Sequence, residues 1–92
     1  MEIRVQSVKF DADQKLLDFI DKKVSKLSKF DESVVSTDVV LSLLPDHDNK
    51  NVKIKMKDLV VERNARTFED AVVDCVDVLK EKLVREKEKR AQ

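Results

Sequence analysis

Four segments of the chain alternate apolar and polar residues, which is the pattern of a half-buried β-strand. They cover residues 1–6, 35–43, 52–56 and 59–65. The apolar side of the second segment carries Val35, Thr37, Val39, Leu41 and Leu43. Pro45 ends that segment, and residues 46–50 are expected to form a polar turn. A tight reversal at Lys57–Asp58 joins the last two segments, although it lacks the Gly that a two-residue hairpin usually requires.

Two other segments repeat apolar residues every three or four positions, as the buried face of an amphipathic helix does. The first predicted helix runs from about Ala12 to Ser28, and its apolar stripe is Leu16, Ile20, Val24 and Leu27. We expect Asp11 to be its N-cap, with Gln14 in capping-box spacing. The second helix begins at Phe68, behind the capping box Thr67–Asp70, and runs towards Lys89 with the stripe Phe68, Val72, Cys75, Leu79 and Leu83. Because residues 86–90 are all polar, the last turn or two (about residues 86–92) is expected to project into solvent or to fray.

The resulting order of elements is β-α-β-β-β-α. Both helices have a single apolar stripe, so the simplest way to bury them is on one face of a four-stranded sheet. This predicts an α+β fold, a two-layer sandwich with both helices on one face. If the first two strands are parallel neighbours, the first helix is the right-handed crossover between them. The chain has 92 residues, which is enough for one such domain and too few for two.

Composition excludes several classes of function. The chain contains no Gly, which excludes a Gly-rich phosphate-binding loop, and no Trp or Tyr, which leaves few rings for base stacking. Lys and Arg total 19 and Asp and Glu also total 19, so the net charge is zero and the protein is not a polycation. Binding to a polyanion stays possible, because charges of opposite sign can lie on different faces. No segment has the length and hydrophobicity of a membrane span or signal peptide, so we expect a cytoplasmic protein with no membrane partner.

The lysines of the first helix are the clearest charge pattern. Four of them fall on one line nearly opposite the apolar stripe, and we call this line the lysine ridge: Lys15, Lys22, Lys26 and Lys29. Such a row of ammonium groups can neutralise nucleic-acid phosphates with sequence-independent affinity. The alternative is an ordinary solvated lysine face, which most soluble helices have.

The second helix carries cations on two flanks. Lys82, Arg85 and Lys89 follow one flank, and Lys80 and Lys87 follow the other. Between the flanks runs an acidic strip of Asp70, Asp77, Glu81 and Glu88, which would repel a polyanion lying across the helix. If the two helices lie side by side, their basic flanks could line one groove, but the sequence does not say which flank faces inward. The alternative for these charges is pairing along the helix, as between Glu81 and Arg85.

A third group of cations lies on the predicted strands. Lys53, Lys55 and Lys57 share one face with Arg4 and could form a second cationic patch. Lysines also protect a sheet edge against aggregation. We favour this second interpretation, because Glu2 and Glu62 are expected on the same face.

Candidates for catalysis or metal binding are few. His47 is the only His and stands in the polar turn, and a lone His cannot form a metal site. Cys75 belongs to the apolar stripe of the second helix, where packing in the core is the expected role. No pair of carboxylates is framed by a pattern that would form a pocket. We therefore expect no enzymatic activity, no cofactor and no small-molecule substrate.

Three segments in this order resemble one known family. They are MEIRVQSVKFDAD, FIDKKVSKLSKF and RTFEDAVVDCVDVLKEKL, and together with the order of elements they resemble the ribosome hibernation-promoting factors, also called ribosome-associated inhibitors or sigma-54 modulation proteins. The motifs that carry the resemblance are Lys26–Phe30 at the end of the first helix and Thr67–Val72 at the start of the second. The resemblance covers most of the chain and is closest to the short members, which lack a C-terminal ribosome-dimerising extension.

The resemblance implies a fold akin to double-stranded RNA-binding domains and a role in translation regulation. Proteins of this family bind the small ribosomal subunit in the channel for messenger and transfer RNA, and they hold ribosomes inactive in stationary phase or stress. By position, the implied contacts with rRNA phosphates are Lys23, Lys26, Lys29, Lys82, Arg85 and Lys89. Lys22 joins these candidates by its place in the lysine ridge. The alternative is a protein-interaction module of the same fold without RNA binding, which the acidic strip and the neutral net charge favour.

Overall fold

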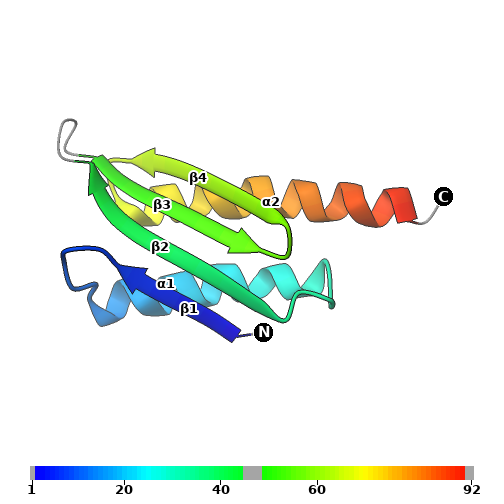
Figure 1. Cartoon of the computed structure of the whole chain (residues 1–92), viewed down its shortest axis with the longest axis horizontal. Helices are drawn as coiled ribbons and strands as arrows, with labels where there is room; N and C mark the ends of the chain where they lie inside the picture. Colours follow the sequence, from blue (N-terminus) through cyan, green and yellow to red (C-terminus); the bar gives the residue numbers. More distant parts are fainter. Residues whose placement is uncertain (1, 45–48, 91–92) are drawn as a thin grey trace.

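The computed structural model describes residues 2–44 and 49–90. Its four strands form one sheet in the order β1-β2-β3-β4 (Figure 1). The strands are β1 (Glu2–Ser7), β2 (Ser36–Leu44), β3 (Asn49–Met56) and β4 (Leu59–Ala65). Strand β1 runs parallel to β2, whereas β3 is antiparallel to both of its neighbours. The predicted element order and four-stranded sheet are thereby confirmed, and the parallel pairing of β1 with β2 makes α1 the crossover between them.

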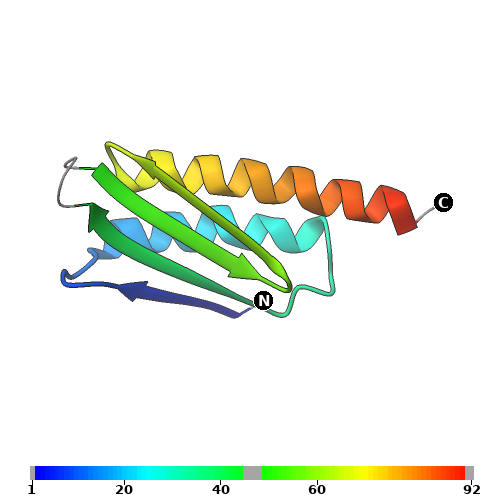
Figure 2. The same cartoon turned by 45° about the horizontal axis from the view of Figure 1, so that its top comes forward.

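Both helices cover the same face of this sheet. Helix α1 (Gln14–Ser25) continues into a 3₁₀ turn, η1 (Lys26–Lys29), and helix α2 (Phe68–Arg90) follows β4. Two views show α1 and α2 side by side behind the sheet, with the last turns of α2 extending past it (Figures 1 and 2). The fold is therefore the predicted two-layer α+β sandwich, and no helix of the described residues covers the second face of the sheet. In the described residues, neither helix is long and apolar enough to cross a membrane.

The core lies between the helices and the sheet. All four residues of the predicted α1–η1 stripe are buried, and so are the α2 residues Val72, Cys75, Leu79 and Leu83. They pack against the inner side of the central strands, which supplies Val39, Leu41, Val52 and Ile54. At one end of the sandwich the ring of Phe10 stacks on that of Phe68, with 5.1 Å between the ring centroids. The segments before α1 and at the start of α2 are joined by this contact.

Several predicted boundaries were wrong by one to three residues. The N-cap of α1 is Asp13 and not Asp11, because the Asp13 carboxylate accepts a hydrogen bond from the Leu16 N–H at 2.9 Å. The capping prediction at Thr67 is confirmed, since its hydroxyl accepts a hydrogen bond from the Asp70 N–H at 3.1 Å. Strand β3 begins at Asn49, three residues earlier than Val52. Residues 45–48, with Pro45 and His47 of the predicted turn, lie outside the described residues.

The alternating pattern around β2 predicted more buried residues than the structure has. Thr37, Val39 and Leu41 point into the core as predicted. At the ends of the run, however, Val35 is 76% exposed and Leu43 is 46% exposed. Val34 is buried in place of Val35, because the segment before β2 is not yet in strand conformation.

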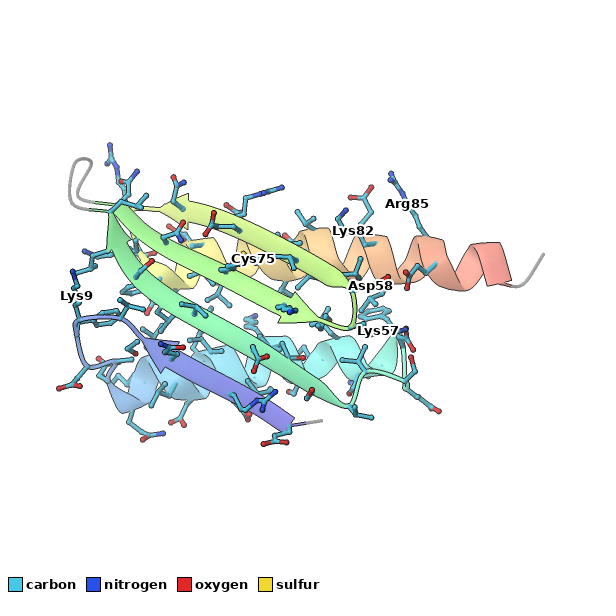
Figure 3. The ribbon with its side chains drawn as sticks, in the orientation of Figure 1. Lys9, Lys57, Asp58, Cys75, Lys82 and Arg85 are labelled. Carbon is cyan, nitrogen blue, oxygen red and sulfur yellow. The ribbon has the colours of Figure 1, made fainter. Side chains whose placement is uncertain are left out.

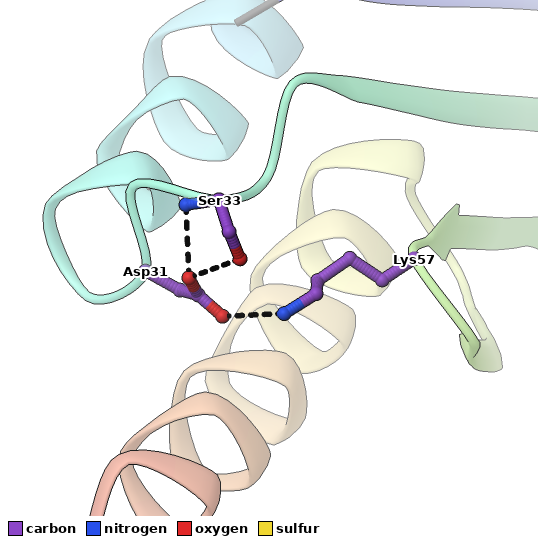
Figure 4. Close-up of polar contacts among 3 residues, drawn as sticks. All are labelled: Asp31, Ser33 and Lys57. Atoms are coloured by element: carbon purple, nitrogen blue, oxygen red, sulfur yellow. Dashed lines mark hydrogen bonds and ion pairs between the residues drawn. The ribbon is translucent and has the colours of Figure 1, made fainter.

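The reversal between β3 and β4 is formed without Gly. Met56 pairs with Leu59, so the loop consists of Lys57 and Asp58 alone, and Lys57 adopts a positive φ of 54°. The Lys57 ammonium reaches Asp31 at 2.8 Å, and Asp31 also accepts hydrogen bonds from the backbone N–H and the hydroxyl of Ser33 (Figure 4). These bonds, with Lys57 the largest contribution, hold the pKa of Asp31 well below its usual value. The ion pair thus fastens the β3–β4 hairpin to the segment that follows η1.

Candidate nucleic-acid interface

A groove of about 400 Å³ runs between α1–η1 and α2, on the helical side of the sandwich. Its lining comes from two segments that are far apart in the sequence. Residues of the first segment are Lys23, Lys26, Leu27, Lys29 and Phe30, and those of the second are Val73, Val76, Asp77 and Lys80. The groove therefore has an apolar floor and carries four lysines and one aspartate.

The change from α-helix to 3₁₀ helix arranges the lysines of the first wall. A 3₁₀ helix has three residues per turn, so side chains three positions apart lie one above the other. Lys26 and Lys29 stand at that spacing within η1. Leu27 is buried beneath them, which anchors η1 to the core. The tighter turn thus aligns two of the lysines along the groove.

The second wall is the flank of α2 that faces α1. Val73, Val76 and Lys80 recur at three and four positions, so they share one side of the helix next to the buried stripe. Val73 is 37% exposed, while Val76 is half-buried against the core. Among its described side chains, α2 contributes one cation to the lining, Lys80.

Two groove lysines lie over aromatic rings. The Lys80 ammonium is 5.2 Å from the centroid of the Phe30 ring, which joins the two walls across the groove. The Lys23 ammonium is 5.6 Å from the centroid of Phe19, one turn earlier in α1. A cation over a ring face is attracted by the ring quadrupole. These contacts limit the freedom of both side chains without neutralising their charge.

None of the four groove lysines forms an ion pair with a carboxylate of the described residues. The ion pairs found there join Arg4 to Asp38, Lys57 to Asp31 and Arg85 to Glu81. Asp77 lines the groove but lies beyond ion-pair distance of its lysines. The groove is therefore a local concentration of available positive charge in a protein of zero net charge.

Of the residues predicted to contact RNA, the structure brings together Lys23, Lys26 and Lys29. Lys22 is exposed on α1 but does not line the groove. Lys82 and Arg85 project from the side of α2 that faces away from α1 (Figure 3), and Arg85 forms the predicted pair with Glu81 at 2.6 Å. The side chain of Lys89 lies outside the described part of the structure.

Lys80 is the groove cation that was not among the predicted contacts. The sequence contained an indication of its role. The apolar surface of α2 continues beyond the buried stripe further towards Lys80 than towards Lys82. Val73 and Val76 stand on that side, and a partly apolar flank indicates a neighbouring element.

The open face of the sheet has a different charge pattern. It carries a second concavity, of about 480 Å³, to which Arg4, Asp38, Lys53 and Lys55 contribute. Arg4 is paired with Asp38 at 2.8 Å, and Lys53 stands opposite Glu62 in the β3–β4 register. The prediction that these lysines protect a sheet edge was wrong, because β3 is an inner strand. Acidic and basic residues alternate across this face.

The candidates for chemistry stay few in the described residues. Cys75 is buried, and its thiol lies 3.5 Å from the Val52 carbonyl oxygen. Burial raises the pKa of this thiol to about 11, so it is protonated at neutral pH and packs as an apolar side chain. Within residues 2–44 and 49–90, no group of three or more His, Cys, Asp or Glu side chains could hold a metal ion.

Comparison with known proteins gives one family and a set of similar structures. The model of the family described as sigma 54 modulation protein / S30EA ribosomal protein matches residues 3–91. The N-terminal domain of Protein Y from Thermus thermophilus is similar with a TM-score of 0.80 and 21% identity, covering 92% of this chain and 98% of that one. A ribosomal subunit interface protein from Coxiella burnetii is similar with a TM-score of 0.79 and 14% identity, covering 95% and 98%. The search of curated proteins finds no match.

Proposed function

The chain belongs to the sigma 54 modulation protein / S30EA ribosomal protein family, which is ribosome-associated, and we propose that it inhibits translation by binding rRNA of the small ribosomal subunit through the groove between α1–η1 and α2. The observation that carries the proposal is the gathering of four lysines from both helical segments, none of which forms an ion pair with a carboxylate of the described residues. Ammonium groups in such a groove replace the counterions of RNA phosphates, and the release of those ions drives binding. The role is one of binding, in the cytoplasm, without catalysis, cofactor or small-molecule substrate.

The proposed contacts differ in their place relative to the groove. Lys23, Lys26, Lys29 and Lys80 form the central contact. Lys22 extends it along the outside of α1. RNA would reach Lys82 and Arg85 only by crossing the acidic strip of α2, in which Asp77 and Glu81 are exposed, so we assign them contacts at the margin of the bound RNA.

The test is co-sedimentation with purified small ribosomal subunits at increasing salt. The variant Lys26→Glu/Lys29→Glu should lose binding, because it reverses two charges in the groove. Its control is Lys53→Glu/Lys55→Glu, which makes the same change in net charge on the open sheet face and should bind like the parent protein. Circular dichroism establishes that both variants are folded. Equal sedimentation of the groove variant and the parent at equal salt would overturn the proposal.

A second arm separates RNA binding from a protein-interaction module of the same fold. Ribonuclease treatment of the complex should release the protein, since rRNA is the proposed ligand. Retention on a protein partner after complete digestion of the RNA would favour the alternative. Inhibition of cell-free translation by the parent, and not by the groove variant, would link binding to the proposed effect.

A further inference from the structure

The groove has a feature that phosphate binding alone does not use. Its floor is apolar and consists of Leu27, Phe30, Val73 and Val76. Val73 is one of the few large apolar residues that the described part of the chain exposes to a substantial degree. Lysine ammonium groups would bind phosphates equally well above a polar floor. An apolar floor between cationic walls fits a ligand that has both an apolar flat surface and negative charge.

An unpaired nucleotide has this combination of properties. Its base offers a flat face to aromatic and aliphatic side chains, and its phosphates stay on the outside. A duplex keeps its bases stacked inside and presents phosphates and hydroxyl groups. It would also be too wide to descend between two packed helices, whose axes lie about 8–10 Å apart.

We propose that the groove seats an unpaired nucleotide, with its base against Val73 and the part of the Phe30 ring that Lys80 does not cover, and with its flanking phosphates on Lys26 and Lys80. This inference rests on the proposed function and specifies the form of RNA that the groove takes. The Lys80 ammonium lies over one face of Phe30 and so stands at the apolar floor itself, where it can meet a phosphate next to the seated base. The protein would then select single-stranded segments of rRNA over helical ones.

The first test uses three synthetic RNAs and fluorescence anisotropy. One is a short single-stranded oligoribonucleotide, the second is the same strand with abasic sites, and the third is the duplex of that strand. The abasic strand keeps every phosphate and lacks bases, so it isolates the contribution of the base. We expect the abasic strand to bind about tenfold more weakly than the intact strand. The duplex should also bind more weakly than the intact strand at equal phosphate concentration.

The second test uses a matched pair of valine variants. Val73→Ser removes an apolar contact from the groove floor, and Val60→Ser removes an exposed valine from the open sheet face; Val60 is 51% exposed and Val73 is 37% exposed. Val73→Ser should weaken binding of the intact strand about threefold, with no change in salt dependence, because no charge is altered. It should leave binding of the abasic strand unchanged. Val60→Ser should leave both affinities unchanged.

The outcomes distinguish this inference from the proposed function. Equal affinity for the intact strand, the abasic strand and the duplex would overturn the seated base while leaving rRNA binding by phosphate contacts in place. Loss of small-subunit binding in the co-sedimentation experiment would concern the proposed function instead. An unchanged affinity of Val73→Ser for the intact strand would also contradict the seated base.

Discussion

Two sets of cations in this domain differ in what holds them. On the open sheet face and at the β3–β4 hairpin, Arg4 and Lys57 are held by carboxylates at 2.8 Å. In the groove between the helices, Lys23 and Lys80 are held by aromatic rings. A carboxylate orders a cation and also cancels its charge. A ring orders the cation and leaves its charge available to a ligand.

This difference resolves the apparent conflict between zero net charge and the proposed binding of a polyanion. The chain has as many acidic as basic residues, so selectivity must come from their placement. On the sheet face Asp38 pairs with Arg4, and Glu62 stands opposite Lys53 in the strand register. In the groove, by contrast, Asp77 is the carboxylate that the described residues contribute to the lining, and it pairs with none of the groove lysines. The net charge therefore says less about polyanion binding by such a protein than does the identity of the group that each cation contacts.

The largest expected effect comes from removing one cation from each wall of the groove. Lys26→Gln/Lys80→Gln should weaken RNA binding about 30-fold near 0.1 M salt, and should lower the slope of log affinity against log salt by about 1.5, because two phosphate contacts are lost. Fluorescence anisotropy across a salt series measures both quantities. The matched variant Lys53→Gln/Lys55→Gln should change neither. Equal effects of the two variants would show that the groove has no special role.

The next effect concerns stability rather than binding. Asp31→Asn breaks the ion pair with Lys57 and should lower the free energy of unfolding at pH 7 by about 1 kcal/mol, measured by urea denaturation. The pKa of Asp31 is lowered in the folded state, so the ionised carboxylate contributes its stability above the unfolded value near 4, and this contribution is lost as the pH falls below that value. Parent and variant should therefore converge in stability at acidic pH.

Asp38→Asn is the comparison for this second prediction. It breaks the ion pair with Arg4, in which the Arg4 and Asp38 side chains are 59% and 47% exposed. Because this pair is more exposed, Asp38→Asn should lower the free energy of unfolding by less than Asp31→Asn does. A larger loss of unfolding free energy in Asp38→Asn than in Asp31→Asn would contradict the prediction that the Asp31–Lys57 pair contributes more to stability.

The smallest expected effect comes from Asp77, the acid of the groove lining. Asp77→Asn should tighten RNA binding about threefold at low salt, because a negative charge is removed near the bound phosphates. Asp74→Asn removes the same charge from α2 at a position that does not line the groove, and should have the smaller effect. Affinity measured by anisotropy distinguishes the two. No gain from Asp77→Asn would indicate that phosphates do not approach this part of the groove.

The sequence predicted the fold well because its periodicities were regular. Leu16, Ile20 and Val24 recur at helical spacing, and every one of them is buried. The errors in element boundaries lie where the sequence pattern of a strand or helix continues beyond the end of that strand or helix. Val35 continues the alternation of β2 but precedes the strand, and Asp11 is as good a capping residue as Asp13. Residue type alone does not choose between two candidate caps that stand two positions apart.

The groove was predicted only in part. The lysines of the first wall could be found because the helix periodicity and the family resemblance coincide at Lys26 and Lys29. The second wall depended on which flank of α2 faces α1, and this is decided by packing of the whole sandwich. Lys80 and Lys82 are both exposed cations, and only the tertiary structure shows that Lys80 meets Phe30.

The groove is built from two segments that are far apart in the sequence, residues 23–30 and 73–80. An unfolded chain cannot present both walls at once, so a ligand of the groove binds only the folded protein. By mass action, a saturating ligand then raises the melting temperature and slows digestion by proteases. On this basis the lifetime of the protein in a cell would depend on how much ligand is available to the groove, because proteases would digest the molecules without bound ligand first.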